Sequence, residues 1–206
     1  MYVSRQEAAK KLAEALDAYR GANPLILAIP RGGVPMGKVL AESLGGELDV
    51  VLIRKLRAPG NPELAIGSID ESGWTYLTPD ASSALVDEAH MAQEKKTQSE
   101  TIRRRRALYT PVRAPIDPRG RTAIVVDDGL ATGSTMIAAL HAVRAKEPQR
   151  LICAVPVAPP ETLIQIAPLA DEVVCLHSPK LFYAVAQFYR EFPQIADNEV
   201  VSLLRA

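Results

Sequence analysis

The sequence predicts an α/β protein with a mainly parallel sheet and helices on both faces. Short apolar runs alternate with segments of helical periodicity, as in repeated strand and helix units. The runs are rich in β-branched residues and show no polar alternation, which is typical of strands covered on both faces. In two of these units, the loop that joins the strand to the following helix contains glycines. Such loops mark the sheet edge at which open α/β proteins bind ligands.

Composition excludes several classes of protein. The 206 residues include 24 basic and 24 acidic side chains, so net charge favours neither a nucleic-acid nor a membrane partner. No apolar stretch is long enough to span a bilayer, and the polar N-terminus lacks the apolar segment of a signal peptide. We therefore expect a soluble cytoplasmic protein. Cys153 and Cys175 lie in apolar strand-like runs outside any metal or disulfide pattern, and we expect two buried free thiols.

The first predicted element is an amphipathic packing helix that ends near Gly21. Ser4 and Glu7 have the spacing of a capping box, and apolar residues then recur on one face. A strand over 25–29 follows, then the loop Pro-Arg-Gly-Gly at 30–33 and a helix over 35–44. Paired glycines at the end of a strand let the backbone approach a ligand and direct its N–H groups toward it.

A third strand is predicted over 48–53, with a cationic end and a breaker-rich segment at 58–62 behind it. Arg54 and Lys55 could bind an anion at this strand end. Solvated charge is the competing interpretation, mainly for Arg57.

A hairpin and a long helix are predicted next. The strands lie over 63–69 and 74–77, with Gly73 in the turn. The helix runs over 82–108, without Gly or Pro and with only a thin apolar stripe. Its end carries Arg103–Arg106, which we interpret as a solvated terminus that complements the helix dipole. The alternative places one of these cations over a polyanionic substrate, or uses them to hold RNA.

The most informative segment begins with a buried strand over 123–126. Asp127 and Asp128 follow it directly, then a loop rich in glycine and hydroxyl residues and a helix over 136–145. A helix N-terminus offers unpaired N–H donors and a partial positive charge, which suit a phosphate. The two carboxylates would repel a polyphosphate alone, but they can accept hydrogen bonds from ribose hydroxyls. The pattern therefore indicates a sugar phosphate.

These residues resemble a known family. The block DDGLATGSTM resembles the phosphoribosyl diphosphate (PRPP) motif of type I phosphoribosyltransferases, and among them the adenine-specific enzymes most. The loop at 30–33 is similar to the pyrophosphate loop of the xanthine and guanine enzymes, which often holds a cis peptide that does not precede proline. Arg54 and Lys55 resemble a pair in the adenine and orotate enzymes, in which the Lys approaches PRPP and the loop that follows can act as a lid.

The resemblance implies a Rossmann-like core over 1–177, with an insertion at about 63–110, and a C-terminal hood over 178–206. It implies transfer of a phosphoribosyl group from PRPP to a nitrogen acceptor, with Asp127, Asp128 and Lys55 as catalytic residues. Mg²⁺ is implied as the cofactor, held by Asp127 and Asp128 through water. The implied PRPP site comprises Arg31, Gly32, Gly33, Arg54, Lys55, Asp127, Asp128, Gly129, Ala131, Thr132, Gly133, Ser134 and Thr135.

The C-terminal part is expected to contain strands over 151–157 and 172–176 with a helix over 160–166 between them. Most aromatic residues follow. Pro179 to Phe182 resembles the base-stacking segment of purine enzymes, so Phe182 and Tyr183 are the implied acceptor-binding residues. Phe188, Tyr189 and Phe192 are instead expected to form the hood's own core.

The pattern also departs from the family. Ala131 occupies the place of an acidic residue that can act as a general base in the 6-oxopurine enzymes, which disfavours hypoxanthine or guanine as the acceptor. Adenine-like, orotate-like and unrelated acceptors stay open. The alternative function is a PRPP-binding sensor or regulator without catalysis, with RNA near Arg103–Arg106. A homodimer also stays open.

The loop over 131–135 carries the sharpest expectation. It contains no Lys or Arg, so it should bind an anion through main-chain N–H groups, the helix N-terminus and the hydroxyls of Thr132, Ser134 and Thr135. Gly133 is expected to be its least replaceable residue. A β-carbon there should intrude where the backbone approaches the anion, or force an unfavourable φ.

Overall fold

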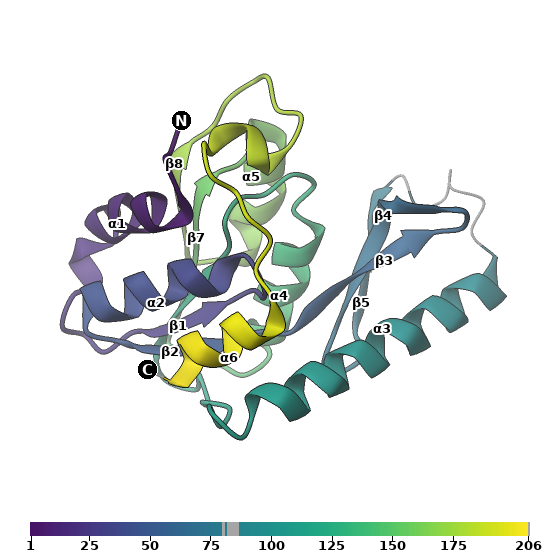
Figure 1. The fold of residues 1–206 in the computed structure, drawn as a ribbon, viewed down its shortest axis with the longest axis horizontal. Coiled ribbons are helices and arrows are strands. Elements are labelled where there is room, and N and C mark those ends of the chain that lie inside the picture. Colours follow the sequence, from purple (N-terminus) through teal and green to yellow (C-terminus); the bar gives the residue numbers. More distant parts are fainter. Residues whose placement is uncertain (80, 82–86, 206) are drawn as a thin grey trace.

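The computed structural model describes residues 1–79, 81 and 87–205. Its centre is a five-stranded sheet in the order β2-β1-β6-β7-β8, in which all neighbours are parallel (Figure 1). This confirms the predicted fold class. The strands are β1 (Leu25–Ala28), β2 (Glu47–Val50), β6 (Thr122–Val126), β7 (Arg150–Val157) and β8 (Glu172–His177).

Helices cover both faces of this sheet, because successive side chains of each strand point to opposite sides. In β1, Ile26 packs into the core under α1, α2 and α6, whereas Leu25 and Leu27 pack into the core under α4 and α5. The helices are α1 (Arg5–Ala15), α2 (Gly33–Leu44), α4 (Ser134–Arg144), α5 (Pro160–Ile166) and α6 (Asp197–Arg205), and short 3-10 turns are η1 (Asp17–Tyr19), η3 (Ala167–Leu169) and η4 (Val185–Phe188).

A second sheet forms an arm that projects from one side of the core (Figure 1). We use "the arm" for β3 (Ile53–Ala58), β4 (Asn61–Asp70), β5 (Thr75–Leu77) and α3 (Glu88–Tyr109). Its strands are antiparallel in the order β3-β4-β5. The predicted hairpin is confirmed, and Gly73 has a φ of 90° in its turn. The start predicted for the long helix, at 82–86, lies outside the described residues.

One predicted strand was wrong. The run over 48–53 is not a single strand, because β2 ends at Val50 and β3 begins at Ile53 in the other sheet. Arg54 and Lys55 consequently lie within β3 and not in a loop after a strand. The expected lid loop at 58–62 is a turn between β3 and β4, with Gly60 at a φ of 68°. The apolar run gave no sign of the break between β2 and β3, because the residues before and after the break are both buried.

The two ends of the chain meet on the core. Tyr2 pairs with Tyr189 in a parallel bridge, and α6 packs against the core beside α2. The Tyr109 hydroxyl of α3 donates a hydrogen bond to Asp197 at 2.7 Å. The boundary between a core at 1–177 and a hood at 178–206 stays a prediction.

Two smaller expectations can be compared with the structure. Cys153 is a buried free thiol as predicted, but Cys175 is only partly buried, because β8 is the last strand of the sheet. Among the described residues, no helix combines the length and apolar character that a membrane span requires.

Candidate active site

A cavity of about 410 Å³ lies where β1 and β6 end, and we name it the acidic-loop cavity. It brings together most of the site residues predicted from the sequence, which come from the core and from the arm. Its lining comprises Arg5, Arg31, Gly32, Lys55, Asp127, Asp128, Gly129, Leu130, Ala131, Thr132, Gly133, Ser134, Thr135, Met136, Val185, Phe192, Gln194 and Ile195.

The two carboxylates follow β6 and differ in their partners. Asp127 accepts a hydrogen bond from the backbone N–H of Asp128 at 2.9 Å, and Asp128 accepts one from Arg5 Nε at 2.8 Å. Burial, with the adjacent Asp128 carboxylate, raises the pKa of Asp127 well above its ordinary value. Burial also raises the pKa of Asp128, although the guanidinium of Arg5 opposes that shift. The site therefore favours a ligand that donates hydrogen bonds or brings positive charge.

Arg5 is a site residue that sequence reasoning missed. Its side chain is buried, donates a second hydrogen bond to the carbonyl of Pro193 at 2.8 Å and lies 3.8 Å from the ring centre of Phe192. Tyr189 holds the same region from the other side, since its hydroxyl donates to the Asp128 carbonyl at 2.6 Å. No signal in the sequence links Arg5 to Asp128, because the pair spans most of the chain.

The glycine loop after β1 is shaped by the carboxylates. The peptide between Pro30 and Arg31 is cis, as the resemblance implied. A β-carbon on Gly32 would lie 2.1 Å from Asp128 Oδ2, and one on Gly33 would lie 2.7 Å from the carbonyl oxygen of Val126. Gly33 does not line the cavity. Both glycines therefore allow two loops of the chain to approach each other, in addition to any approach to a ligand.

The loop before α4 has the predicted form. Gly133 has a φ of 74° and α4 begins at Ser134, so the first-turn N–H groups lie at the cavity wall. Thr162 of α5 fixes the loop by donating to the Ala131 carbonyl at 2.6 Å. The unfavourable φ expected at Gly133 is confirmed, and a β-carbon there would in addition lie 2.7 Å from the Thr162 methyl group. Anion binding by the loop stays a prediction.

Cations reach the site from both the core and the arm. A cavity of about 340 Å³ adjoins the first and shares Arg31, Lys55, Asp127 and Thr135 with it. Arg54 and Arg57 line only this adjoining cavity. Arg54 donates to Gln98 of α3 at 3.0 Å, and burial lowers its pKa from the ordinary value. The adjoining cavity is thus a cationic extension of the acidic-loop cavity.

The structure does not bring Phe182 and Tyr183 to the cavity. Tyr183 is 85% exposed, and the Phe182 ring packs 5.1 Å from the ring of Phe188. Phe192, which was expected inside the hood core, lines the cavity instead with three neighbours of the C-terminal segment. Those neighbours are Val185, Gln194 and Ile195.

The four arginines at the end of α3 are not one solvated cluster. Arg105 forms an ion pair with Asp197 at 3.2 Å, and Arg106 forms one with Glu71 at 2.5 Å. Arg103 and Arg104 are exposed. Half of the cluster therefore serves to join α3 to the C-terminal helix and to the turn between β4 and β5, which weakens the case for RNA binding there.

Comparison with known proteins identifies the family. The model of the phosphoribosyl transferase domain matches residues 3–192. A Mycobacterium tuberculosis protein that carries the name phosphoribosyl transferase is 40% identical over 205 residues. This match covers 99% of the present chain but 46% of the relative, so the chain spans about half the length of the curated relatives it matches.

Solved structures share the fold. The crystal structure of TT1426 from Thermus thermophilus is 41% identical, has a TM-score of 0.82 and is covered over 98% of its length by 100% of this chain. A purine phosphoribosyltransferase from Pyrococcus horikoshii is 17% identical with a TM-score of 0.51, over 95% of this chain and 97% of that one, and shows the fold alone. The chain belongs to the phosphoribosyl transferase domain family.

Proposed function

We propose that the protein transfers a 5-phosphoribosyl group from PRPP to a nitrogen acceptor and releases pyrophosphate. The observation that carries this proposal is the acidic-loop cavity, which places two carboxylates, a helix N-terminus and Lys55 around one space. A sugar phosphate has a group for each of them. Its phosphate suits the N–H groups of the loop, its hydroxyls suit the carboxylates, and a pyrophosphate suits the cationic extension.

The chain's own residues would act by position and charge. Asp127 and Asp128 would orient the ribose and stabilise positive charge that develops at its anomeric carbon. Lys55, with Arg31, would stabilise negative charge on the departing pyrophosphate more strongly in the transition state than in the ground state. Arg5 would act as a positioning residue, because it keeps the Asp128 carboxylate turned toward Gly32.

Mg²⁺ fits this site as a partner of the substrate. Within the described residues, no three His, Cys, Asp or Glu side chains converge on one point. Two adjacent carboxylates with raised pKa values suit a hard cation whose other ligands are substrate oxygens and water. When bound, Mg²⁺ would neutralise and orient the pyrophosphate.

The acceptor would lie against the C-terminal segment. Phe192 offers a ring face, Gln194 an amide that can donate and accept, and Val185 with Ile195 apolar contact. Ala131 cannot move a proton, so the acceptor should need little help from a general base. The missing acidic residue disfavours 6-oxopurines, and adenine-like, orotate-like and unrelated acceptors stay open.

A pyrophosphate-release assay tests the proposal. The protein would be incubated with PRPP, Mg²⁺ and a panel of bases, with the Asp128→Asn variant as the control. We expect release with at least one base and a large loss in the variant, because the amide keeps the shape but not the charge. PRPP binding without turnover across the panel would instead support the sensor, and absence of PRPP binding would reject both. The cytoplasmic location and a homodimer stay predictions.

A further inference from the structure

Two hydroxyl groups from outside the loop before α4 bind carbonyl oxygens of that loop. Ser68 of β4 donates to the Ser134 carbonyl at 2.6 Å, and Thr162 of α5 donates to the Ala131 carbonyl at 2.6 Å. The first hydroxyl belongs to the arm and the second belongs to the core. The loop is therefore held near both of its ends by side chains that are far from it in sequence.

Both hydroxyls are buried and lie behind the loop. Ser68 is 0% exposed and Thr162 is 3% exposed. Neither residue lines the acidic-loop cavity, whereas every residue from Ala131 to Thr135 does. The two hydrogen bonds consequently reach the loop on the side away from the cavity. An apolar side chain of similar size would avoid the cost of burying a hydroxyl, so the two hydroxyls indicate a role at the carbonyls they bind.

The two bound carbonyls determine where two N–H groups point. The Ala131 carbonyl belongs to the same peptide as the N–H of Thr132, and the Ser134 carbonyl belongs to the same peptide as the N–H of Thr135. Both peptides are trans, so each N–H points opposite to its carbonyl. Because the carbonyls are bound behind the loop, both N–H groups point to the side of the cavity.

Neither of these N–H groups has a hydrogen-bond acceptor among the described residues. In the first turn of α4, the N–H of Ile137 already donates to the Gly133 carbonyl at 2.9 Å, whereas those of Thr132 and Thr135 make no such bond. Both can therefore donate to a ligand. A hydrogen bond to the carbonyl of a peptide also strengthens the N–H of that peptide as a donor, because hydrogen bonds in a chain polarise one another.

Ser68 also affects the place of a cation. It lies directly opposite Lys55 in the antiparallel pairing of β3 and β4, so the two side chains share one face of the arm. Lys55 lines both the acidic-loop cavity and its cationic extension. The hydrogen bond from Ser68 to Ser134 thus holds β4, and with it the strand that carries Lys55, against the loop.

We propose that Ser68 and Thr162 are positioning residues for the phosphate group of the substrate. Their hydroxyls bind the rear of the loop and direct the N–H groups of Thr132 and Thr135 toward one phosphate. The proposal rests on the proposed function, because it concerns the 5-phosphate of the same substrate. It adds two residues that do not touch the ligand and that act through the peptide groups they hold.

Binding of ribose 5-phosphate, measured by titration calorimetry, tests the proposal without requiring turnover. At Thr162, two variants separate the hydroxyl from the methyl group. Thr162→Val keeps the shape and loses the hydroxyl, and it should weaken binding about three- to tenfold. Thr162→Ser keeps the hydroxyl and loses the methyl group, and it should bind within about twofold of wild type. A role in packing alone predicts the opposite order.

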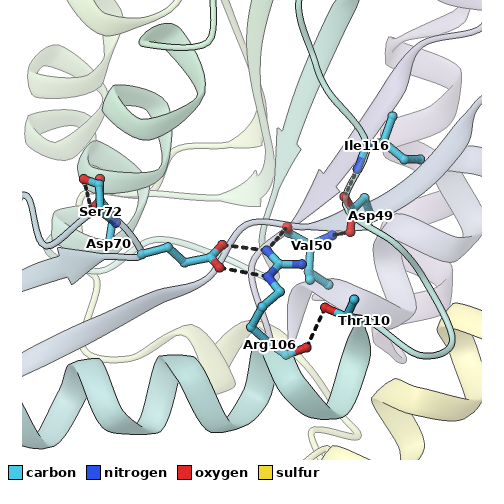
Figure 2. A network of polar contacts seen from close by, with 8 residues as sticks. Asp49, Val50, Asp70, Ser72, Arg106, Thr110 and Ile116 are labelled. Atoms are coloured by element: carbon cyan, nitrogen blue, oxygen red, sulfur yellow. Dashed lines mark hydrogen bonds and ion pairs between the residues drawn. The ribbon is translucent and has the colours of Figure 1, made fainter.

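Ser68→Ala tests the contribution of the arm and should weaken binding by a similar factor of about three to ten. Ser72→Ala is the matched control, because the Ser72 hydroxyl donates to Asp70 at 2.6 Å in the turn between β4 and β5 (Figure 2), and Ser72 lines neither cavity of the site. The control should stay within about twofold of wild type. The NMR resonance of the Thr135 amide should shift in Ser68→Ala and not in Ser72→Ala. Thermal unfolding shows whether each variant is folded.

The outcomes distinguish this proposal from the proposed transfer. Unchanged affinity in Ser68→Ala or in Thr162→Val would overturn the role of that residue and leave the transfer intact. Equal losses in Thr162→Val and Thr162→Ser, or in Ser68→Ala and Ser72→Ala, would also overturn it, because they would assign the effect to packing or to a loosened arm. Absence of binding by wild type at millimolar ribose 5-phosphate would reject the anion site and with it both proposals.

Discussion

The core sheet and the arm contribute to the same site by different physical means. Core strands such as β6 are buried on both faces, and the loops that follow β1 and β6 carry the carboxylates and N–H groups of the site. In β3, buried residues are interspersed with more exposed ones, and Lys55 and Arg57 occupy exposed positions. The core therefore supplies fixed carboxylates and N–H groups, and the arm supplies cations from a half-exposed surface.

The core therefore fixes the positions of groups in the site, whereas the arm mainly adds positive charge. The carboxylate of Asp128 is held by Arg5 and by the close passage of Gly32, and Tyr189 holds the backbone carbonyl of the same residue. Within the described part of the chain, Lys55 has no such set of contacts, and its role depends on where the arm lies. Changes on the core side should thus disturb ligand geometry, whereas changes on the arm should disturb charge or local stability.

The largest effect is expected from Gly32→Ala, which tests the core side. Its β-carbon would displace the Asp128 carboxylate, and PRPP affinity should fall about a hundredfold. Calorimetry with PRPP and Mg²⁺ measures it. Gly37→Ala is the matched control, because its β-carbon would meet Leu48 at 2.7 Å, away from the cavity. That control should lower stability and leave affinity unchanged; equal affinity losses would refute the specific role of Gly32.

Lys55→Met tests the arm side. Removing a cation opposite the departing pyrophosphate should lower kcat about ten- to a hundredfold, with a smaller change in the KM for PRPP. Steady-state kinetics with the acceptor found in the panel measures both. Arg57→Met, on the same strand but absent from the lining of the acidic-loop cavity, should have the smaller effect. The opposite ranking would reassign the cationic role to Arg57.

Gly67→Ala separates the stability of the arm from that of the core. A β-carbon on Gly67 would lie 2.2 Å from the carbonyl oxygen of Tyr76, so β4 and β5 should separate at a cost of about 1–3 kcal/mol. Hydrogen exchange should accelerate in β4 and β5 and stay slow in β6. Equal acceleration in β6 would show that the arm and the core unfold as one unit.

The smallest effect is expected at the edge of the core. Arg144 and the backbone N–H of Leu151 bind Asp171 and hold its pKa below the ordinary value of 3.8. A lowered pKa stabilises the fold above that value, and the contribution is lost as pH falls below it. Because the pair is exposed, Asp171→Asn should cost only about 0.5 kcal/mol at pH 7. Urea unfolding should show the difference shrinking as the pH falls below 3.8.

The sequence by itself determined the parallel core and most of the site. Asp127, Asp128 and the loop to Thr135 follow one strand directly, so their proximity is a local property of the chain. Apolar runs and helix caps predicted the order of strands and helices for the same reason. Such features depend on neighbours in sequence, and periodicity reports them.

Tertiary structure decided what depends on residues far apart in sequence. The exit of the chain into the arm after Val50, the pairing of Arg5 with Asp128, and the replacement of Phe182 by Phe192 at the cavity all arise from packing between distant segments. No local pattern encodes them, because in a sequence an arginine next to a helix cap looks the same whether it is buried or solvated. Their geometry follows only once the N-terminal helix and the C-terminal segment meet over the end of the sheet.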